Sequence, residues 1–84
     1  MFLAKVYITY KKGVLDPQGS TVKKALGTMG FDTIKDVRVG KYMEIMLEEK
    51  EKDVAEQKIK EMCDKVLTNP VIEEYSYDIL EVRK

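Results

Sequence analysis

The chain has 84 residues, in which 15 Lys and Arg balance 15 Asp and Glu, with one cysteine and no histidine. This length fits one domain, residues 1–84, and the balanced charge gives no positive field that would hold nucleic acid. An intrachain disulfide, a zinc site of Cys and His ligands and a histidine-dependent nucleophile are all excluded.

The hydropathy pattern excludes a membrane protein. No apolar run approaches the roughly 20 residues that a membrane-spanning helix needs, and the first residues lack the pattern of a signal peptide. We therefore expect a cytosolic protein. A domain this short buries only a small core, and oligomerisation is a common remedy, so we also expect a partner chain.

The first predicted element is a strand over residues 2–10, followed by a turn that starts a helix. Asp16 can accept hydrogen bonds from the first free amides of that helix, and Pro17 suits the first helical position because it has no N–H to leave unpaired. These two residues would start the helix alone. The added Gly13 and Gly19 suggest a recognised surface, and a well-capped turn without further role is the alternative.

An amphipathic helix is predicted next, because apolar residues recur at helical spacing up to the stop at Gly30. The residues of this apolar stripe are Val22, Ala25, Leu26 and Met29. Two strands should follow, over residues 34–39 and 42–47, joined by a tight turn. An odd-numbered loop with Gly40 in the left-handed region would place Val37 on the same face as Met43 and Ile45.

The last part of the chain predicts a second helix and a final strand. The apolar stripe of the helix comprises Val54, Ala55, Ile59, Met62, Cys63 and Val66. On that stripe Cys63 is interpreted as a small core residue and not as a reactive thiol. Asn69 and Pro70 should end the helix. The strand over 71–82 changes its apolar phase near Leu80, which suggests a bulge or two different neighbours.

This order predicts an α+β fold, the ferredoxin-like β-α-β-β-α-β sandwich, with an antiparallel sheet and both helices on one face. The opposite face would carry Leu3, Tyr7, Tyr42 and Met46, together with Leu80 or Val82. That is more apolar surface than a monomer usually leaves exposed. We therefore predict a dimer or higher oligomer formed through the sheet.

The remaining residues indicate little chemistry. The strand over 34–39 has no aromatic residue to stack an RNA base, and adjacent glutamates such as Glu73 and Glu74 point to opposite faces of a strand. Arg38 and Lys41 could hold an anion, but they form no glycine-rich phosphate loop. No catalytic residue and no metal site are predicted.

Four segments together resemble the PurS subunit of phosphoribosylformylglycinamidine synthase, and the resemblance extends over nearly the whole chain. They are residues 13–19, Gly30 with Phe31, residues 37–41, and Cys63 with residues 67–73 and Tyr75. Two mild departures are Thr68, where the family more often has a small apolar residue, and Val66, where Leu is usual.

The resemblance implies a non-catalytic small subunit of an ATP-dependent, glutamine-using ligase complex in purine biosynthesis. A glutaminase subunit would release ammonia, and a synthetase subunit would use ATP and Mg. This chain would bind no cofactor itself and would bring the two together. Its contacts are expected in three loops, because recognition residues concentrate in loops on a rigid scaffold. They are Asp16, Pro17, Gln18 and Gly19, then Arg38, Gly40 and Lys41, and finally Asn69 and Pro70.

In the expected fold the first two of these loops would lie at opposite ends of the sheet, as a bridge requires. Two other functions stay open. One is a regulatory domain of the same fold that binds a small metabolite. The other is a small enzyme that uses Arg38 and Lys41 as an anion clamp.

Overall fold

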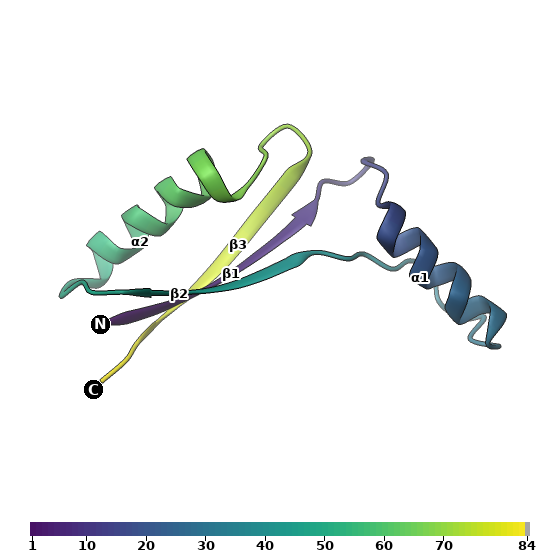
Figure 1. Ribbon diagram of the computed structural model, residues 1–84, viewed down its shortest axis with the longest axis horizontal. Helices are drawn as coiled ribbons and strands as arrows, with labels where there is room; N and C mark the ends of the chain where they lie inside the picture. Colours follow the sequence, from purple (N-terminus) through teal and green to yellow (C-terminus); the bar gives the residue numbers. More distant parts are fainter. Residues whose placement is uncertain (84) are drawn as a thin grey trace.

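The computed structural model describes residues 1–83 and has a three-stranded antiparallel sheet with two α-helices (Figure 1). The elements in chain order are β1 (Phe2–Tyr10), α1 (Pro17–Thr28), β2 (Lys41–Leu47), α2 (Lys52–Met62), the π-helical turn η1 (Cys63–Leu67) and β3 (Glu73–Glu81). The strand order is β2-β1-β3, with β1 in the centre. The predicted α+β class with an antiparallel sheet is confirmed.

The core lies between the sheet and α2. Alternate residues of β1 face α2 and are at most 4% exposed; they are Phe2, Ala4, Val6 and Ile8. From the helical side Ile59 and Cys63 are fully buried against them. The apolar residues at alternate positions of β1 thus pack against one apolar stripe of α2, as the sequence pattern predicted. Cys63 is a core residue, as expected, and burial raises the pKa of its thiol.

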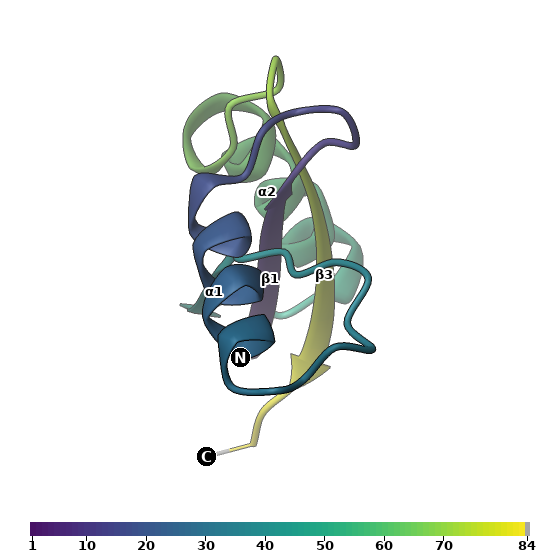
Figure 2. The ribbon, with the colours of Figure 1, turned by 90° about the vertical axis from the view of Figure 1, so that its right-hand side faces the viewer.

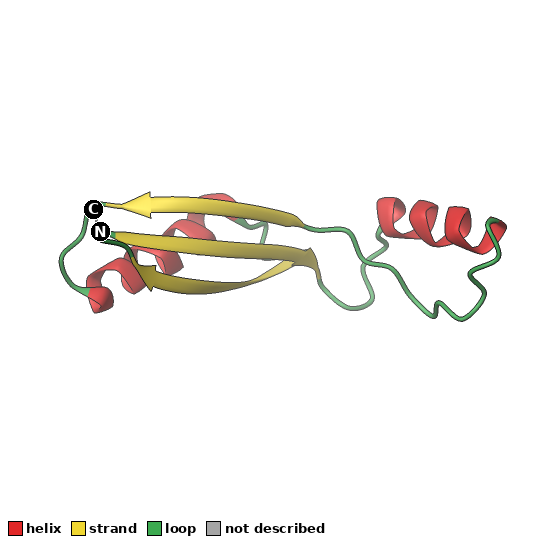
Figure 3. Ribbon diagram, turned by 90° about the horizontal axis from the view of Figure 1, so that it is seen from below, coloured by secondary structure: helices red, strands yellow, loops and turns green. Residues whose placement is uncertain are grey.

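The first helix does not lie on the sheet. Figures 1 and 3 show α1 beyond the end of the strands, whereas α2 covers one face. The molecule is accordingly elongated, measuring 50 × 30 × 14 Å, and its radius of gyration of 16.4 Å exceeds the about 12 Å expected of a compact chain of this length. The prediction that both helices cover one sheet face was wrong for α1, because an apolar stripe does not reveal which surface covers it.

The predicted strand over residues 34–39 is also absent. Within residues 1–83 the segment between α1 and β2 joins no strand, so the sheet has three strands and not the four of the ferredoxin-like pattern. The Val39 N–H donates to the side chain of Asp16 at 2.8 Å and not to a neighbouring strand. The hairpin and its odd loop are therefore corrected as well, and among the described residues only Gly13 and Gly30 have positive φ.

Two details near the C-terminus differ from expectation. The β1–β3 register runs from Phe2–Glu81 to Tyr10–Glu73 without a break, so β3 contains no bulge. The phase change arises because Leu80 belongs to the sheet face opposite α2. In η1 the Thr68 N–H donates to the Cys63 carbonyl at 3.0 Å, which widens the last turn. This leaves Val66 80% exposed and packs Leu67 on the core instead.

Candidate partner-binding surfaces

The three loops predicted to bind partners gather at one end of the sheet, where β1 ends and β2 and β3 begin. Figure 2 views the molecule from this end, with α1 in front of the sheet and α2. The expectation that the turn before α1 and the segment before β2 lie at opposite ends was wrong, because it assumed a hairpin that the structure lacks. One subunit therefore presents one composite loop surface, which we call the loop end, comprising residues 16–19, 38–41 and 69–70.

Asp16 holds the first two loops together. Its Oδ1 accepts a hydrogen bond from the Gly19 N–H at 2.9 Å, which confirms the predicted helix cap, and its Oδ2 accepts one from the Val39 N–H at 2.8 Å. The bond from Gly19, then that from Val39, lowers the pKa of the Asp16 carboxyl. Position 19 has no room for a side chain, because a Cβ there would lie 2.2 Å from the Val37 carbonyl oxygen. The carboxylate thus serves two loops at once.

The segment before β2 is tied to the end of β1. The guanidinium of Arg38 donates to the Tyr10 carbonyl oxygen. Gly40 passes so close to β1 that a Cβ would lie 2.3 Å from the Ile8 carbonyl oxygen. This close approach, and not a left-handed conformation, explains the glycine. Arg38 is exposed, yet it has a structural partner that the sequence did not reveal.

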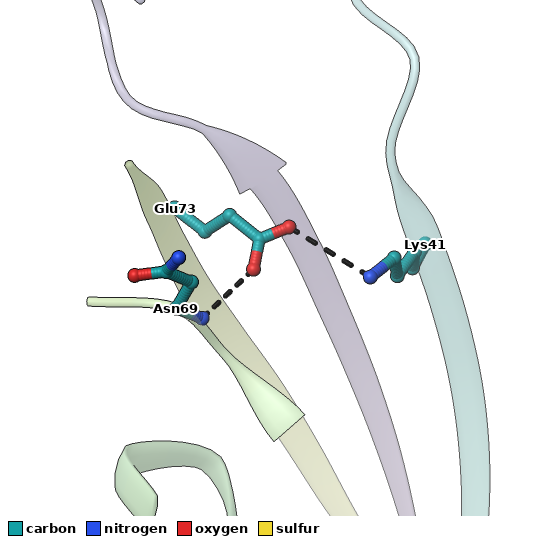
Figure 4. A network of polar contacts seen from close by, with 3 residues as sticks. All are labelled: Lys41, Asn69 and Glu73. Atoms are coloured by element: carbon teal, nitrogen blue, oxygen red, sulfur yellow. Dashed lines mark hydrogen bonds and ion pairs between the residues drawn. The ribbon is translucent and has the colours of Figure 1, made fainter. Parts of the chain in front are cut away.

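The corner at Asn69 and Pro70 completes the loop end. Glu73 Oε1 accepts from the Asn69 N–H at 2.8 Å, while its Oε2 lies 3.9 Å from Lys41 Nζ (Figure 4). Lys11 Nζ donates to the Pro70 carbonyl oxygen at 2.5 Å, which connects this corner to the turn after β1. The Lys41 side chain is 65% exposed, whereas that of Glu73 is 13% exposed. An ion pair with one solvated partner at this distance adds little stability, and the bond from the Asn69 N–H is the closer contact of Glu73 at this corner.

The loop end does not form an anion clamp. Arg38 bonds to a carbonyl and Lys41 lies beside a carboxylate, so the two cations do not converge. A depression of about 450 Å³ lies next to α1. Its lining carries both signs of charge, from Lys12, Asp16, Lys23, Asp36 and Arg38. Within residues 1–83 no group of three metal-ligating side chains gathers, and no helix is long and apolar enough to cross a membrane.

The sheet face opposite α2, which we call the open face, carries the four residues predicted for self-association. Leu3 pairs with Met46, and Tyr7 pairs with Tyr42, the two rings lying 5.2 Å apart between centroids. Tyr7, Tyr42 and Met46 are 40%, 51% and 54% exposed. The Tyr42 hydroxyl donates to Glu44 at 2.7 Å, which raises its pKa to about 12.

Three further features of the exposed surface matter, and of these the sequence predicted only Leu80, as an alternative to Val82. Leu80 pairs with Leu3 on the open face and is 46% exposed. A charged row, Glu44, Lys5 and Asp78 across the three strands, separates the leucines and Met46 from the two tyrosines. The stripe of α1 was expected on the sheet, yet Val22 and Met29 are 40% and 74% exposed. The pairing register of the three strands would have revealed the charged row, but no local sequence signal shows where α1 lies relative to the sheet.

Comparison with known proteins supports the resemblance. The family model for PurS, phosphoribosylformylglycinamidine (FGAM) synthase, matches residues 3–81. The synthase subunit PurS of Bacillus subtilis is 49% identical over 82 residues, covering 98% of this chain and 96% of that protein. The chain belongs to the PurS family. The PurS subunit of Archaeoglobus fulgidus is 46% identical over 74 residues, with coverage of 88% and 92%.

Solved structures of PurS proteins have the same fold. Methanocaldococcus jannaschii PurS, described as a subunit of formylglycinamide ribonucleotide amidotransferase in purine biosynthesis, has a TM-score of 0.87 at 37% identity, covering 99% of this chain and 100% of that one. A chain of PurLQS from Thermotoga maritima has a TM-score of 0.83 at 30% identity, with coverage of 95% and 99%. This chain is therefore a small subunit of FGAM synthase, as the sequence predicted, and the metabolite-binding alternative is not favoured.

Proposed function

We propose that this chain is the non-catalytic connector of an FGAM synthase complex, in which it holds a glutaminase subunit beside a synthetase subunit and assists ammonia transfer. The Thermotoga relative occurs in a PurLQS assembly. The chain itself has no histidine, and at the loop end Asp16 and Arg38 bond to backbone groups while Lys41 pairs with Glu73. The activation of an amide with ATP and Mg, and the release of ammonia from glutamine, then belong to the other subunits in the cytosol.

The observation that carries this proposal is the gathering of the three loops predicted to bind partners at one end of the sheet, on a surface distinct from the open face. One chain then has one surface for a partner subunit and a separate surface for another copy of itself. Because each copy offers a single loop end, a bridge between two different subunits requires at least two copies. Self-association is therefore part of the proposed function and not only a means of stabilising a small domain.

The open face is the proposed surface for self-association. Leu3, Tyr7, Tyr42 and Met46 expose apolar area on a regular sheet, where a second sheet could pack at about 10 Å. The charged row constrains that packing, because two sheets stacked directly on a two-fold axis through Lys5 would bring like charges together. A copy displaced by one strand would instead set Lys5 against Glu44 of its mate. Displacement by one strand in the other direction would set Lys5 against Asp78 of the second copy, so the row disfavours direct stacking and favours these two registers.

The decisive test is reconstitution with and without this chain. With glutamine as nitrogen source, the synthetase and glutaminase subunits should form product only when this chain is present. With ammonia supplied directly at high concentration, product formation should need the chain much less, since ammonia is what the glutaminase delivers. A full glutamine-dependent rate in the absence of this chain would contradict the connector function.

A further inference from the structure

The direction of α1 is not fixed by packing on the sheet. Of its 12 residues only Gly19 is buried, and the helix lies beyond the strands (Figure 3). The chain reaches it through a turn containing Gly13 and leaves it through Gly30, both with positive φ. Glycines are the most freely rotating residues of a chain. Contacts near the start of α1 must therefore hold the helix in place.

Asp16 supplies the most specific of these contacts. Its bond from Gly19 caps the helix, and such a cap needs only one oxygen. Its other oxygen accepts from Val39, which lies 23 positions along the chain in the segment that returns to β2. A carboxylate that accepts two amide N–H groups makes two charge-assisted bonds with fixed geometry. Asp16 therefore joins the first turn of α1 to a distant segment.

The neighbouring contacts continue this connection to the sheet. A Cβ on Gly19 would lie 2.2 Å from the Val37 carbonyl oxygen, so the first turn of α1 rests directly on the returning segment. Lys23 Nζ donates to the Lys35 carbonyl oxygen at 2.6 Å further along the helix. Arg38 ties the same segment to Tyr10 at the end of β1. The path from sheet to α1 thus passes through residues 37–39 and Asp16.

We propose that Asp16 is a positioning residue whose bond from the Val39 amide fixes the direction of α1 relative to the sheet, and that glutamine-dependent synthesis requires this direction. The second half of the inference rests on the connector function proposed above. The first half concerns the isolated chain alone. If Asp16 only capped the helix, Ser would replace it without loss. The two bonds are made by two different carboxylate oxygens, and Ser has one oxygen on a shorter side chain, so it can take the place of Oδ1 at Gly19 but not also that of Oδ2 at Val39.

The distance between α1 and α2 tests the first half. Spin labels on Lys24→Cys and Lys60→Cys, both exposed helical positions, report it by double electron–electron resonance. Cys63 is fully buried, and a labelling reaction on the parent checks that it stays unlabelled. Dilution of the labelled chain into excess unlabelled chain removes distances between copies. The variants are Asp16→Ser, which keeps the cap, Asp16→Ala, which loses it, and Asp32→Ser as a control for lost charge.

We expect the parent and Asp32→Ser to give one narrow distance distribution, and Asp16→Ser to give a broad one despite parent-like helicity by circular dichroism. Gly19→Ala is a second variant, since its methyl group would lie 2.2 Å from the Val37 carbonyl oxygen and 2.7 Å from Asp16 Oδ2, and it should broaden the distribution as well. In the reconstituted complex Asp16→Ser should lose several-fold of the glutamine-dependent rate and little of the ammonia-dependent rate.

Two results would overturn the inference. One is a parent-like distance distribution in Asp16→Ser, which would show that Asp16 is a cap only. The other is a broad distribution with an unchanged glutamine-dependent rate, which would show that the direction of α1 is not needed. Failure of the connector function itself is recognised separately, because the glutamine-dependent rate would then persist when the parent chain is left out.

Discussion

Thr68 allows a quantitative test of the core. It is 7% exposed, and its Oγ1 has no hydrogen-bond partner among the described residues. In mutational data a buried hydroxyl without a hydrogen-bond partner lowers the free energy of unfolding by about 1–3 kcal/mol. Valine has the same shape and suits the extended backbone of this position, where φ is −123° and ψ is 138°. Thr68→Val should therefore raise the free energy of unfolding by about 1 kcal/mol or more.

In a domain of this size about 1 kcal/mol corresponds to about 4–8 °C in the melting temperature. Thermal and urea unfolding would measure the change at one fixed protein concentration, because self-association shifts apparent stability. Thr68→Ser keeps the hydroxyl and removes a methyl group, so it should instead lower stability by about 0.5–1.5 kcal/mol. Thr33→Val, at an exposed position, is the control for a change of side-chain type.

The order of stability should be Val above Thr above Ser at position 68. If Thr68→Val is no more stable than the parent, the hydroxyl has a partner in solution, such as a water molecule or another copy of the chain. The reasoning from an unpaired buried group would then be wrong. A gain at Thr33 as large as that at Thr68 would refute it equally.

Three further predictions concern surfaces and pH. Tyr7→Glu should weaken self-association measured by sedimentation equilibrium more than Lys24→Glu does, because only the first places charge on the open face, and equal effects would contradict that assignment. Gln18→Ala should change the free energy of unfolding by no more than about 0.5 kcal/mol and should lower the glutamine-dependent rate. Gln57→Ala on α2 is the control and should leave that rate unchanged. If Gln18→Ala turns over like the parent, the turn before α1 binds no partner. Burial and the 2.8 Å hydrogen bond to Asp64 raise the pKa of Tyr75 from 10.0 to about 12. Stability that is present below pH 10 should thus fall as the pH rises to about 12, and Tyr75→Phe should lose less over this window in urea titrations.

The sequence by itself determined which chemistry the chain lacks, where α1 begins and where the chain turns back before β3. A composition with no histidine and one cysteine is enough to exclude whole classes of catalytic and metal sites. Asp16 and Pro17 start α1 as predicted, and the chain turns back at Asn69 and Pro70 after η1. These features are local, because capping and the constraints of proline act within a few residues. Period-two alternation likewise placed Leu3, Tyr7, Tyr42 and Met46 on one sheet face.

Only the tertiary structure decided how those elements meet. The stripe of α1 and the alternation of Val37 and Val39 show that these residues prefer to be covered, but a pattern along the chain is the same whether the cover is the chain's own sheet or another molecule. The direction of α1 depends on a hydrogen bond between Asp16 and Val39, 23 residues apart. That bond engages the Val39 N–H, which pairs with no neighbouring strand, and joins two of the three loops at one end of the sheet. Local propensity carries no information about such a contact, because the partners are neighbours only after folding.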